Sequence, residues 1–316
     1  MNPGAYPRQR PLIHEVGPRD GLQSEAAIVP LDQRIRWITA LIDAGIDIVQ
    51  LGSFVNPQKV PQMADTERLF QHFSGADRRH AGVVLSALVL NEKGLERGLA
   101  CNADMYCMGV SASPTHSLKN TGMSPSEALP RIVAMAKTAR AEGKLVQASV
   151  QSAFGCGYEG AVNSSAVLHI VKAYLDAGIR NISLADTAGH AHPAQVEDLY
   201  GSIAELQPGL ELACHFHNTY GLGLANCLAA MRAGVTYLES SFGGLGGCPF
   251  TKVAAGNVST EDLVHSLQRM GLRGDIDLGA LLDVARQVGT FFDRELPGLV
   301  LRSGSIVGFT GNAEGG

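Results

Sequence analysis

The tetrapeptide Asp43-Ala44-Gly45-Ile46 returns as Asp176-Ala177-Gly178-Ile179 and, in a related form, as Arg232-Ala233-Gly234-Val235. Each copy closes a stretch with the helical spacing of apolar residues and opens an apolar run typical of a buried strand. Glycine is the residue that most readily takes the left-handed conformation common at a helix C-terminus. The repeated phrase therefore marks points where a helix ends and the next strand begins.

Strand and helix patterns alternate outward from these junctions along the whole chain. The expected strands are residues 12–16, 46–51, 81–90, 103–110, 145–151, 181–185, 210–215 and 237–241. The expected helices are residues 32–44, 63–73, 91–100, 124–142, 164–176, 193–206, 222–233 and 261–270. Eight such units predict an α/β fold, a (β/α)8 TIM barrel over about residues 12–272, with extra C-terminal helices over about 277–295 and flexible tails. An open doubly wound sheet is the alternative, but no Gly-x-Gly-x-x-Gly motif follows the first strand.

Composition excludes several classes of function. The 316 residues are 45% hydrophobic and 17% charged, with a formal net charge of -5, and no basic run suggests a nucleic-acid partner. No apolar stretch is long enough to cross a membrane, and residues 1–10 lack the apolar core of a secretory signal. Six cysteines without Cys-x-x-Cys spacing indicate reduced thiols. We therefore expect a cytoplasmic protein whose partner is a small molecule.

In a TIM barrel the functional residues lie at the carboxyl ends of the strands, because the loops there converge on one rim. His215 and His217 lie two residues apart at the end of the seventh expected strand, so their side chains point to the same face. Asp20 follows the first strand, and Asn257 follows a Gly-rich segment after the eighth. Two imidazoles, a carboxylate and an amide oxygen suit a divalent ion such as Mg²⁺, Mn²⁺ or Zn²⁺. The competing interpretation is an ordinary strand with one buried and one exposed histidine.

Three further residues at the rim have side chains that could take part in catalysis. Arg19 could stabilise negative charge that develops on a substrate, or it could only neutralise nearby acids. Asp186 ends the sixth strand and could be a ligand, a general base or a hydrogen-bonding partner. Cys248 follows the glycine-rich run 243–247. So many glycines cost backbone entropy on folding, and this cost indicates a loop that either moves or packs tightly against another segment. The Cys248 thiol could donate a proton to a carbanion, or it could be a small packed side chain. Other histidines are expected at the surface or around the site, at positions 14, 72, 80, 116, 169, 190, 192 and 265.

Five motifs resemble those of the 3-hydroxy-3-methylglutaryl-CoA lyase family. They are EVGPRDGLQ at 15–23, SFVNP at 53–57, VPQMAD at 60–65, GCGYEG at 155–160 and GGLGGCP at 243–249. The resemblance runs in order from about residue 12 to about residue 295. It implies a TIM barrel, a divalent metal, Mg²⁺ or Mn²⁺ above all, and an acyl-CoA substrate of which CoA is a part.

Matched position by position, the resemblance also implies roles for single residues. The implied metal ligands are Asp20, His215, His217 and Asn257. The implied catalytic residues are Arg19, which would stabilise an enolate, Cys248 on a flexible loop, Asp186 in the catalytic site and Gln50 at the end of the second strand.

The reaction that the resemblance implies is a retro-Claisen cleavage. The metal would lower the pKa of the substrate's tertiary 3-hydroxyl, and His215 or Asp186, directly or through water, would remove its proton. The C2–C3 bond would then break, giving a ketone and the enolate of acetyl-CoA. Arg19 would stabilise the enolate oxygen and Cys248 would help to protonate the carbon. With 3-hydroxy-3-methylglutaryl-CoA the products are acetoacetate and acetyl-CoA.

The chain departs from the family pattern at several rim positions. Gln50 stands in place of a glutamate, Leu51-Gly52 in place of two threonines, Asn218 in place of an aspartate, and Ala26 where a lysine is typical. We expect Gln50 to keep a hydrogen bond to the arginine without pairing its charge, and Gly52 to provide room for a bulkier acyl group. A related substrate such as citramalyl-CoA, which would give acetyl-CoA and pyruvate, therefore stays open.

Two functions of other kinds also stay open. Barrel relatives such as the isopropylmalate synthases run the reverse condensation, so a Claisen-type acyl transferase is one alternative. A metal-binding barrel whose catalytic activity has decayed is the other. The sequence does not fix the oligomeric state, for which a homodimer is one option.

Overall fold

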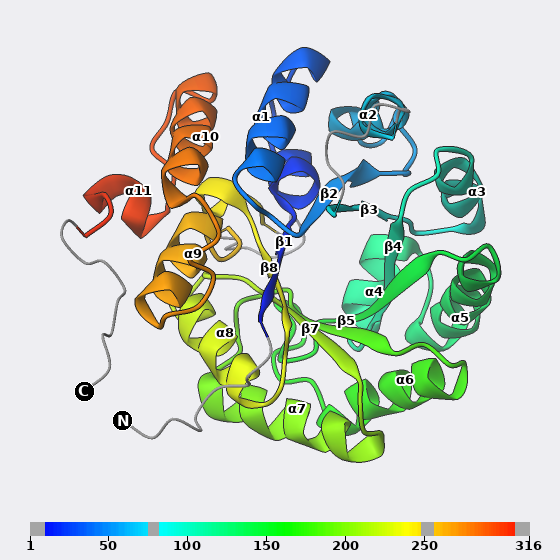
Figure 1. Ribbon diagram of the computed structural model, residues 1–316. Helices are drawn as coiled ribbons and strands as arrows, with labels where there is room; N and C mark the ends of the chain where they lie inside the picture. Colours follow the sequence, from blue (N-terminus) through cyan, green and yellow to red (C-terminus); the bar gives the residue numbers. More distant parts are fainter. Residues whose placement is uncertain (1–9, 75–81, 248–255, 307–316) are drawn as a thin grey trace.

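A ring of parallel strands surrounded by helices forms the centre of the molecule (Figure 1). The computed structural model describes residues 10–74, 82–247 and 256–306. Within these residues the strands are β1 Leu12–Glu15, β2 Ile48–Ser53, β3 Val84–Leu88, β4 Met105–Ser111, β5 Leu145–Gln151, β6 Asn181–Asp186, β7 Glu211–Phe216 and β8 Tyr237–Ser240. They follow one another in chain order, and β1 pairs with both β2 and β8, so the sheet is closed. The predicted TIM barrel is confirmed.

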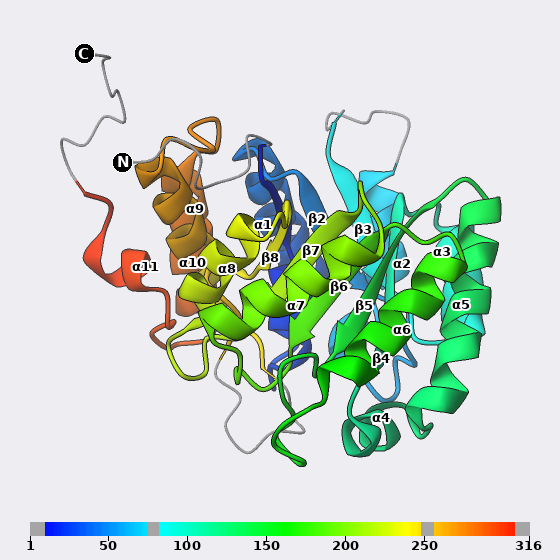
Figure 2. The same cartoon turned by 90° about the horizontal axis from the view of Figure 1, so that it is seen from below.

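The helices cover the outside of the barrel (Figure 2). They are α1 Leu31–Asp43, α2 Thr66–Phe73, α3 Glu92–Ala100, α4 Pro114–Thr121, α5 Pro125–Ala141, α6 Ser164–Asp176, α7 Pro193–Leu206, α8 Gly223–Arg232, α9 Thr260–Arg269, α10 Leu278–Phe291 and α11 Leu299–Ser303, with short turns η1 Gly17–Gly21, η2 Pro61–Met63 and η3 Phe242–Gly244. Helix α10 lies between α9 and α1, where it completes the outer ring. No helix in the described part of the chain is both long and apolar enough to span a membrane.

The predicted helix–strand junctions have the expected geometry. Gly45 has a φ of 96° and Gly178 a φ of 79°. After each glycine the next residue's N–H reaches back five residues: Ile46 donates to Leu41 at 3.3 Å, and Ile179 donates to the Tyr174 carbonyl at 3.0 Å. This bonding satisfies carbonyls at the helix end and turns the chain into the following strand.

Helix α4 is an element that the expected strand–helix units do not contain. Ser113 caps it by accepting a hydrogen bond from the His116 N–H, Pro114 occupies its first turn, and Gly122 ends it with a φ of 74°. Serine before proline at the start and glycine at the end are recognisable signals for a short helix. The helix follows β4 directly, so it lies at the carboxyl-terminal rim of the barrel.

The hydrophobic core lies mainly between the outer face of the sheet and the helices. Its largest fully buried side chains include Trp37, Phe70, Tyr106, Tyr174 and Tyr200. Inside the barrel a smaller apolar cluster of Ile48, Met105 and Cys107 fills one end. Towards the carboxyl ends of the strands the inward-facing side chains become polar, and this change marks the position of a site.

Candidate metal centre

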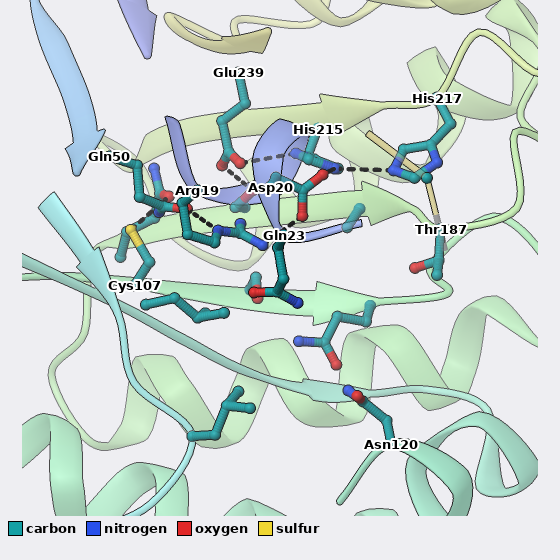
Figure 3. Close-up of a pocket in the computed structure, with 18 of the residues that line it drawn as sticks. Arg19, Asp20, Gln23, Gln50, Cys107, Asn120, Thr187, His215, His217 and Glu239 are labelled. Carbon is teal, nitrogen blue, oxygen red and sulfur yellow. Dashed lines mark hydrogen bonds and ion pairs between the residues drawn. The ribbon is translucent and has the colours of Figure 1, made fainter. Parts of the chain in front are cut away.

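A cavity of about 180 Å³ opens among the carboxyl ends of the strands and reaches into the barrel (Figure 3). Most of the residues that line it are polar; Leu88, Leu90 and Ala185 are apolar contributors. TIM-barrel interiors are usually filled by bulky apolar side chains. A polar hollow at this rim is therefore a candidate binding site rather than part of the packing.

Asp20, His215 and His217 bring their ligand atoms together at one wall of this cavity. One carboxylate oxygen and one nitrogen of each ring lie within 4.8 Å of one another. Nε2 of His215 is 3.1 Å from Nε2 of His217 and 3.9 Å from Oδ2 of Asp20. Both histidines are buried, at 9% and 5% exposure. The alternative of one buried and one exposed histidine is therefore wrong.

Asn257 is brought to the same wall by pairing of its segment with the end of β7. Asn257 forms an antiparallel bridge with His217, and the Val258 N–H donates to the Phe216 carbonyl at 3.1 Å. The Asn257 amide nitrogen donates to Asp20 at 2.8 Å and to the Leu245 carbonyl at 3.0 Å. Its oxygen is buried and has no hydrogen-bond partner among the described residues. An orphaned amide oxygen beside a carboxylate and two imidazoles fits a divalent cation.

The turn η1 directs both Arg19 and Asp20 into the cavity. The Val16 carbonyl accepts the N–H groups of Arg19, Asp20 and Gly21, which tightens the chain immediately after β1. Arg19 then donates from Nε to the Gln50 side-chain oxygen and from its other end to Asp20. The predicted hydrogen bond between Gln50 and Arg19 is confirmed. Burial alone would raise the pKa of Asp20, but the charges of Arg19 and the two ligand histidines hold it well below its usual range.

Glu239 on β8 is a site residue that the sequence interpretation missed. Its Oε2 lies 3.0 Å from Nδ1 of His215, and its Oε1 accepts the Ser183 hydroxyl at 2.9 Å. Burial raises the pKa of Glu239, but the hydrogen bond and charge of His215 more than offset this and lower it. A carboxylate on Nδ1 fixes the proton there and leaves Nε2 facing the ligand set. The available signal was an acid at an inward-facing position of an expected barrel strand.

Asp186 occupies a different position from the other candidates. Its carboxylate accepts the backbone N–H groups of His190 at 2.8 Å and Ala191 at 3.1 Å. Burial raises its pKa to about 6, with these two bonds opposing the rise. Its neighbours Ala185 and Thr187 line the cavity, and Asp186 does not. The carboxylate therefore holds the loop between β6 and α7 and lies outside the group of converging ligand atoms.

Two departures from the family pattern prove to act away from the cavity. The expectation that Gly52 makes room for a larger acyl group is wrong, because a Cβ there would lie 2.4 Å from the Thr66 hydroxyl, on the side of α2. The register between β2 and β3 shifts between Gln50 and Gly52, which turns residue 52 outward. Asn218 accepts the Gly223 N–H at 3.0 Å at the start of α8. An aspartate oxygen could do the same, so this exchange leaves the cavity unchanged.

The glycine run after β8 is tightly apposed to the ligand set in its described part. Gly246 has a φ of 116°, and a Cβ on it would lie 2.3 Å from the Asn257 amide nitrogen and 3.2 Å from Oδ2 of Asp20. Gly243 packs as closely against Leu296. Close approach thus accounts for these glycines. Cys248, the candidate proton donor at the end of the run, lies outside the described residues.

Comparison with known proteins agrees with this geometry. The sequence model of the HMGL-like family matches residues 10–288. The chain belongs to the HMGL-like family. It is 37% identical over 292 residues to a hydroxymethylglutaryl-CoA lyase of Bacillus subtilis, covering 92% of this chain and 96% of the relative. It is 38% identical over 280 residues to the mitochondrial hydroxymethylglutaryl-CoA lyase of Bos taurus, covering 89% and 85% of the two chains.

Solved structures of the same family share the barrel. An HMG-CoA lyase from Acinetobacter baumannii, in complex with coenzyme A and 3-methylmalate, superposes with a TM-score of 0.88 at 35% identity, over 95% of this chain and 97% of that one. The HMG-CoA lyase of Bacillus subtilis gives a TM-score of 0.88 at 36% identity, over 94% and 98%. The family membership thus extends over the barrel and the C-terminal helix α10.

Proposed function

We propose that this protein is a divalent-metal-dependent carbon–carbon lyase that cleaves 3-hydroxy-3-methylglutaryl-CoA to acetoacetate and acetyl-CoA. One observation carries the proposal: donors from three separate loops converge beside Arg19 at the rim of a barrel of the HMGL-like family. The same activity gives its name to relatives that cover nearly the whole chain.

The metal ligands in this proposal are Asp20, His215, His217 and Asn257. When bound, a divalent ion supplies Lewis acidity towards an alcohol oxygen and lowers its pKa. Oxygen and imidazole donors without a thiolate favour Mg²⁺ or Mn²⁺, with Zn²⁺ as the alternative. Asp20 stays ionised at neutral pH because its pKa is held low, so it offers a charged ligand throughout the physiological range.

Arg19 is proposed to stabilise the enolate of acetyl-CoA as the C2–C3 bond breaks. Its guanidinium is oriented by Gln50 on one side and by Asp20 on the other. Because Gln50 is an amide, it orients the guanidinium without neutralising it. The charge of Arg19 is therefore shared with one carboxylate only, and more of it acts on the oxygen of the thioester.

His215 is favoured over Asp186 as the group that takes the hydroxyl proton. Its ring lines the cavity, whereas the Asp186 carboxylate is held by two backbone N–H groups. Glu239 would stabilise the imidazolium through Nδ1. Nε2 cannot hold a proton and an ion at once, so His215 would take the proton only after Nε2 has left the ion, which Asp20, His217 and Asn257 would still hold. Asp186 is proposed to support the site by holding its loop.

Other parts of the proposal rest on the sequence and the family. Cys248 is proposed to protonate the enolate carbon, CoA enters as part of the substrate, and the protein is proposed to act in the cytoplasm. A homodimer stays a prediction. A single barrel domain with a helical extension stays the proposed domain organisation.

The test is an assay of acetyl-CoA release by the purified full-length chain. The protein is freed of metal, reloaded with Mg²⁺ or Mn²⁺, and supplied with 3-hydroxy-3-methylglutaryl-CoA or citramalyl-CoA. Metal-dependent release from the first substrate with acetoacetate as the second product supports the proposal. Release from citramalyl-CoA alone, with pyruvate, would show a lyase of altered specificity. Condensation of acetyl-CoA with a keto acid, or no reaction in either direction, would overturn the proposal in favour of a transferase or a decayed enzyme.

A further inference from the structure

The barrel wall has a gap between β1 and β2 at its carboxyl-terminal rim. Pairing of these two strands ends with Glu15 opposite Val49, because η1 turns the chain almost immediately after β1. We call the gap beyond this residue pair the β1–β2 seam. Arg19 and Gln50 stand on opposite sides of the seam, and the hydrogen bond between them crosses it inside the cavity (Figure 3). The orientation of the Arg19 guanidinium therefore depends on the width of the seam.

Arg34 crosses the same seam from the outside of the barrel. It lies on α1, which covers this part of the wall (Figure 1). Its Nη2 donates to two carbonyls, that of Pro18 at 3.1 Å and that of Leu51 at 3.0 Å. Pro18 directly precedes Arg19, and Leu51 directly follows Gln50. One arginine thus joins the two sides of the seam at their backbones, and the other joins them at their side chains.

The Arg34 guanidinium is buried and bonded to backbone carbonyls. The residue is 2% exposed, and its Nη1 donates to the Gln62 carbonyl at 3.1 Å. Burial lowers its pKa to about 10, with the charge of Asp65 opposing the shift, so the guanidinium stays charged at neutral pH. No carboxylate hydrogen-bonds to it among the residues that the structure describes. Burying a charge without such a partner costs free energy, which the three carbonyl bonds have to offset. Stability is therefore a weak explanation for this arginine.

The metal ligands are held on the other side of η1, away from the seam. The Val16 N–H donates to the Ser240 carbonyl at 2.8 Å, which keeps the chain before η1 on β8. The Asn257 amide nitrogen donates to Asp20 at 2.8 Å on the same side. A wider seam would therefore separate Arg19 from the amide that orients it, while the ligand set stays together. Loss of the outer link should affect the stabilisation of the enolate and spare the metal.

We propose that Arg34 is a positioning residue, which fixes the width of the β1–β2 seam and so holds Gln50 where its side chain orients Arg19. The inference rests on the proposed lyase function for its catalytic consequence. It adds to that function a requirement outside the cavity, at a residue that never touches the substrate.

Arg273 provides a matched control at the opposite end of the same two strands. Its side chain is 0% exposed, and it donates to the carbonyls of Pro11 at 2.9 Å and Gly45 at 3.3 Å, which precede β1 and β2. It also pairs with Asp47 at 2.6 Å. Arg273→Met therefore removes a buried guanidinium that joins the β1 side to the β2 side, but it leaves the rim untouched.

The first measurement is kcat with 3-hydroxy-3-methylglutaryl-CoA, expressed per folded protein. Arg34→Met keeps most of the side-chain volume and removes every donor, and we expect it to lower kcat by about 10- to 100-fold, as a misplacement of about 1 Å can do. Its dissociation constant for Mn²⁺ should stay within about twofold of wild type, because the ligands do not depend on the seam. Arg273→Met should also lose stability, but it should keep the wild-type kcat.

The same substitution in an Arg19→Ala background shows which residue Arg34 acts through. If it acts through Arg19, adding Arg34→Met to Arg19→Ala should lower kcat by no more than about twofold. Arg34→Lys keeps the charge, but its single nitrogen cannot take the places of both Nη1 and Nη2. Its kcat should fall between those of Arg34→Met and wild type.

A second measurement does not depend on lyase activity. In a ¹H–¹⁵N spectrum, the Nε–H signal of Arg19 is identified by its loss in Arg19→Ala. This N–H donates to Gln50 from a residue that is 9% exposed, so it should exchange slowly with solvent in wild type. Its exchange should become faster by about tenfold or more in Arg34→Met and stay unchanged in Arg273→Met.

Two sets of results would overturn the inference. Wild-type kcat and wild-type exchange in Arg34→Met would show that the seam keeps its width without this residue. Equal losses of kcat from Arg34→Met in the wild-type and Arg19→Ala backgrounds, or the same loss in Arg273→Met, would show a role in stability alone.

Two further outcomes still decide the inference. If Arg34→Met does not fold, Arg34→Lys takes its place: a lower kcat with faster exchange supports the inference, and no change in either overturns it. If wild type cleaves no thioester with any metal, the proposed function fails, and the exchange of the Arg19 Nε–H alone then supports or overturns the positioning role.

Discussion

Oε2 of Glu239 lies 3.0 Å from Nδ1 of His215, inside the barrel and below the metal ligands. Burial lowers the pKa of His215, but the hydrogen bond and charge of Glu239 outweigh burial and raise it. The Ser183 hydroxyl holds the other carboxylate oxygen at 2.9 Å, so the glutamate has one orientation. The pair therefore sets which nitrogen of His215 faces the cavity and how strongly that nitrogen attracts a cation or a proton.

Replacing Glu239 with glutamine should weaken metal binding without removing a ligand. We expect the dissociation constant for Mn²⁺ to rise by about 10- to 100-fold, the range typical of lost carboxylate partners of ligand histidines. Isothermal titration calorimetry on metal-free protein measures it. Glu205→Gln on the exposed face of α7 is the matched control and should bind as wild type does. Wild-type affinity in Glu239→Gln would show that the imidazole is oriented without the carboxylate.

Arg19 should matter for the chemical step more than for the metal. Arg19→Ala should lower kcat by about 100- to 1,000-fold, the usual loss when one donor to a developing oxyanion is removed. Mn²⁺ affinity should change little by comparison, because the guanidinium is not a ligand. Full activity in this variant would remove Arg19 from the mechanism, and loss of Mn²⁺ binding in parallel with activity would assign it to holding Asp20.

The metal ligands and the residue that orients one of them differ in how well the sequence predicts them. Asp20, His215, His217 and Asn257 stand in or beside recognisable turns at strand ends, and the strand order alone brings such positions together. Glu239 was missed because an acid within a strand carries no sign of which histidine it faces. The role of Gly52 was misjudged for a related reason. Alternation predicts a side chain's face only while the register is regular, and β2 shifts its register at that residue.

A buried carboxyl group near the glycine run should make stability depend on pH. Burial raises the pKa of Glu15 to about 8, although Thr260 and the N–H groups of Gly17 and Phe242 hydrogen-bond to it. The ordinary value is 4.5. Between these values the folded state binds more protons at Glu15 than the unfolded state does, so this group destabilises the fold progressively as pH rises from about 5 to about 8.

Glu15→Gln removes that titration and can keep the hydrogen bonds to the amide N–H groups. Its melting temperature minus that of wild type should therefore increase as pH rises through this window. Thermal unfolding followed by circular dichroism at several pH values measures the difference. Glu205→Gln should show no such trend. A difference that stays constant with pH would mean that Glu15 has the same protonation state in the folded and unfolded chain.

Gly246 should be needed for the metal centre because of its position rather than for loop flexibility. A methyl group there would approach the Asn257 amide nitrogen to 2.3 Å and Oδ2 of Asp20 to 3.2 Å, so Gly246→Ala should push the two ligands apart. We expect Mn²⁺ affinity to fall by about tenfold or more, as the ligand geometry is disturbed.

Gly143→Ala is the matched control: its φ of 72° is also positive, but a Cβ there meets nothing within 4 Å. Both variants should lose stability through the strained backbone, by about 1 kcal/mol, and only Gly246→Ala should lose the metal. Equal Mn²⁺ affinities in the two variants would show that the loop yields to the extra methyl group, and that close packing of residue 246 does not hold the ligands in place.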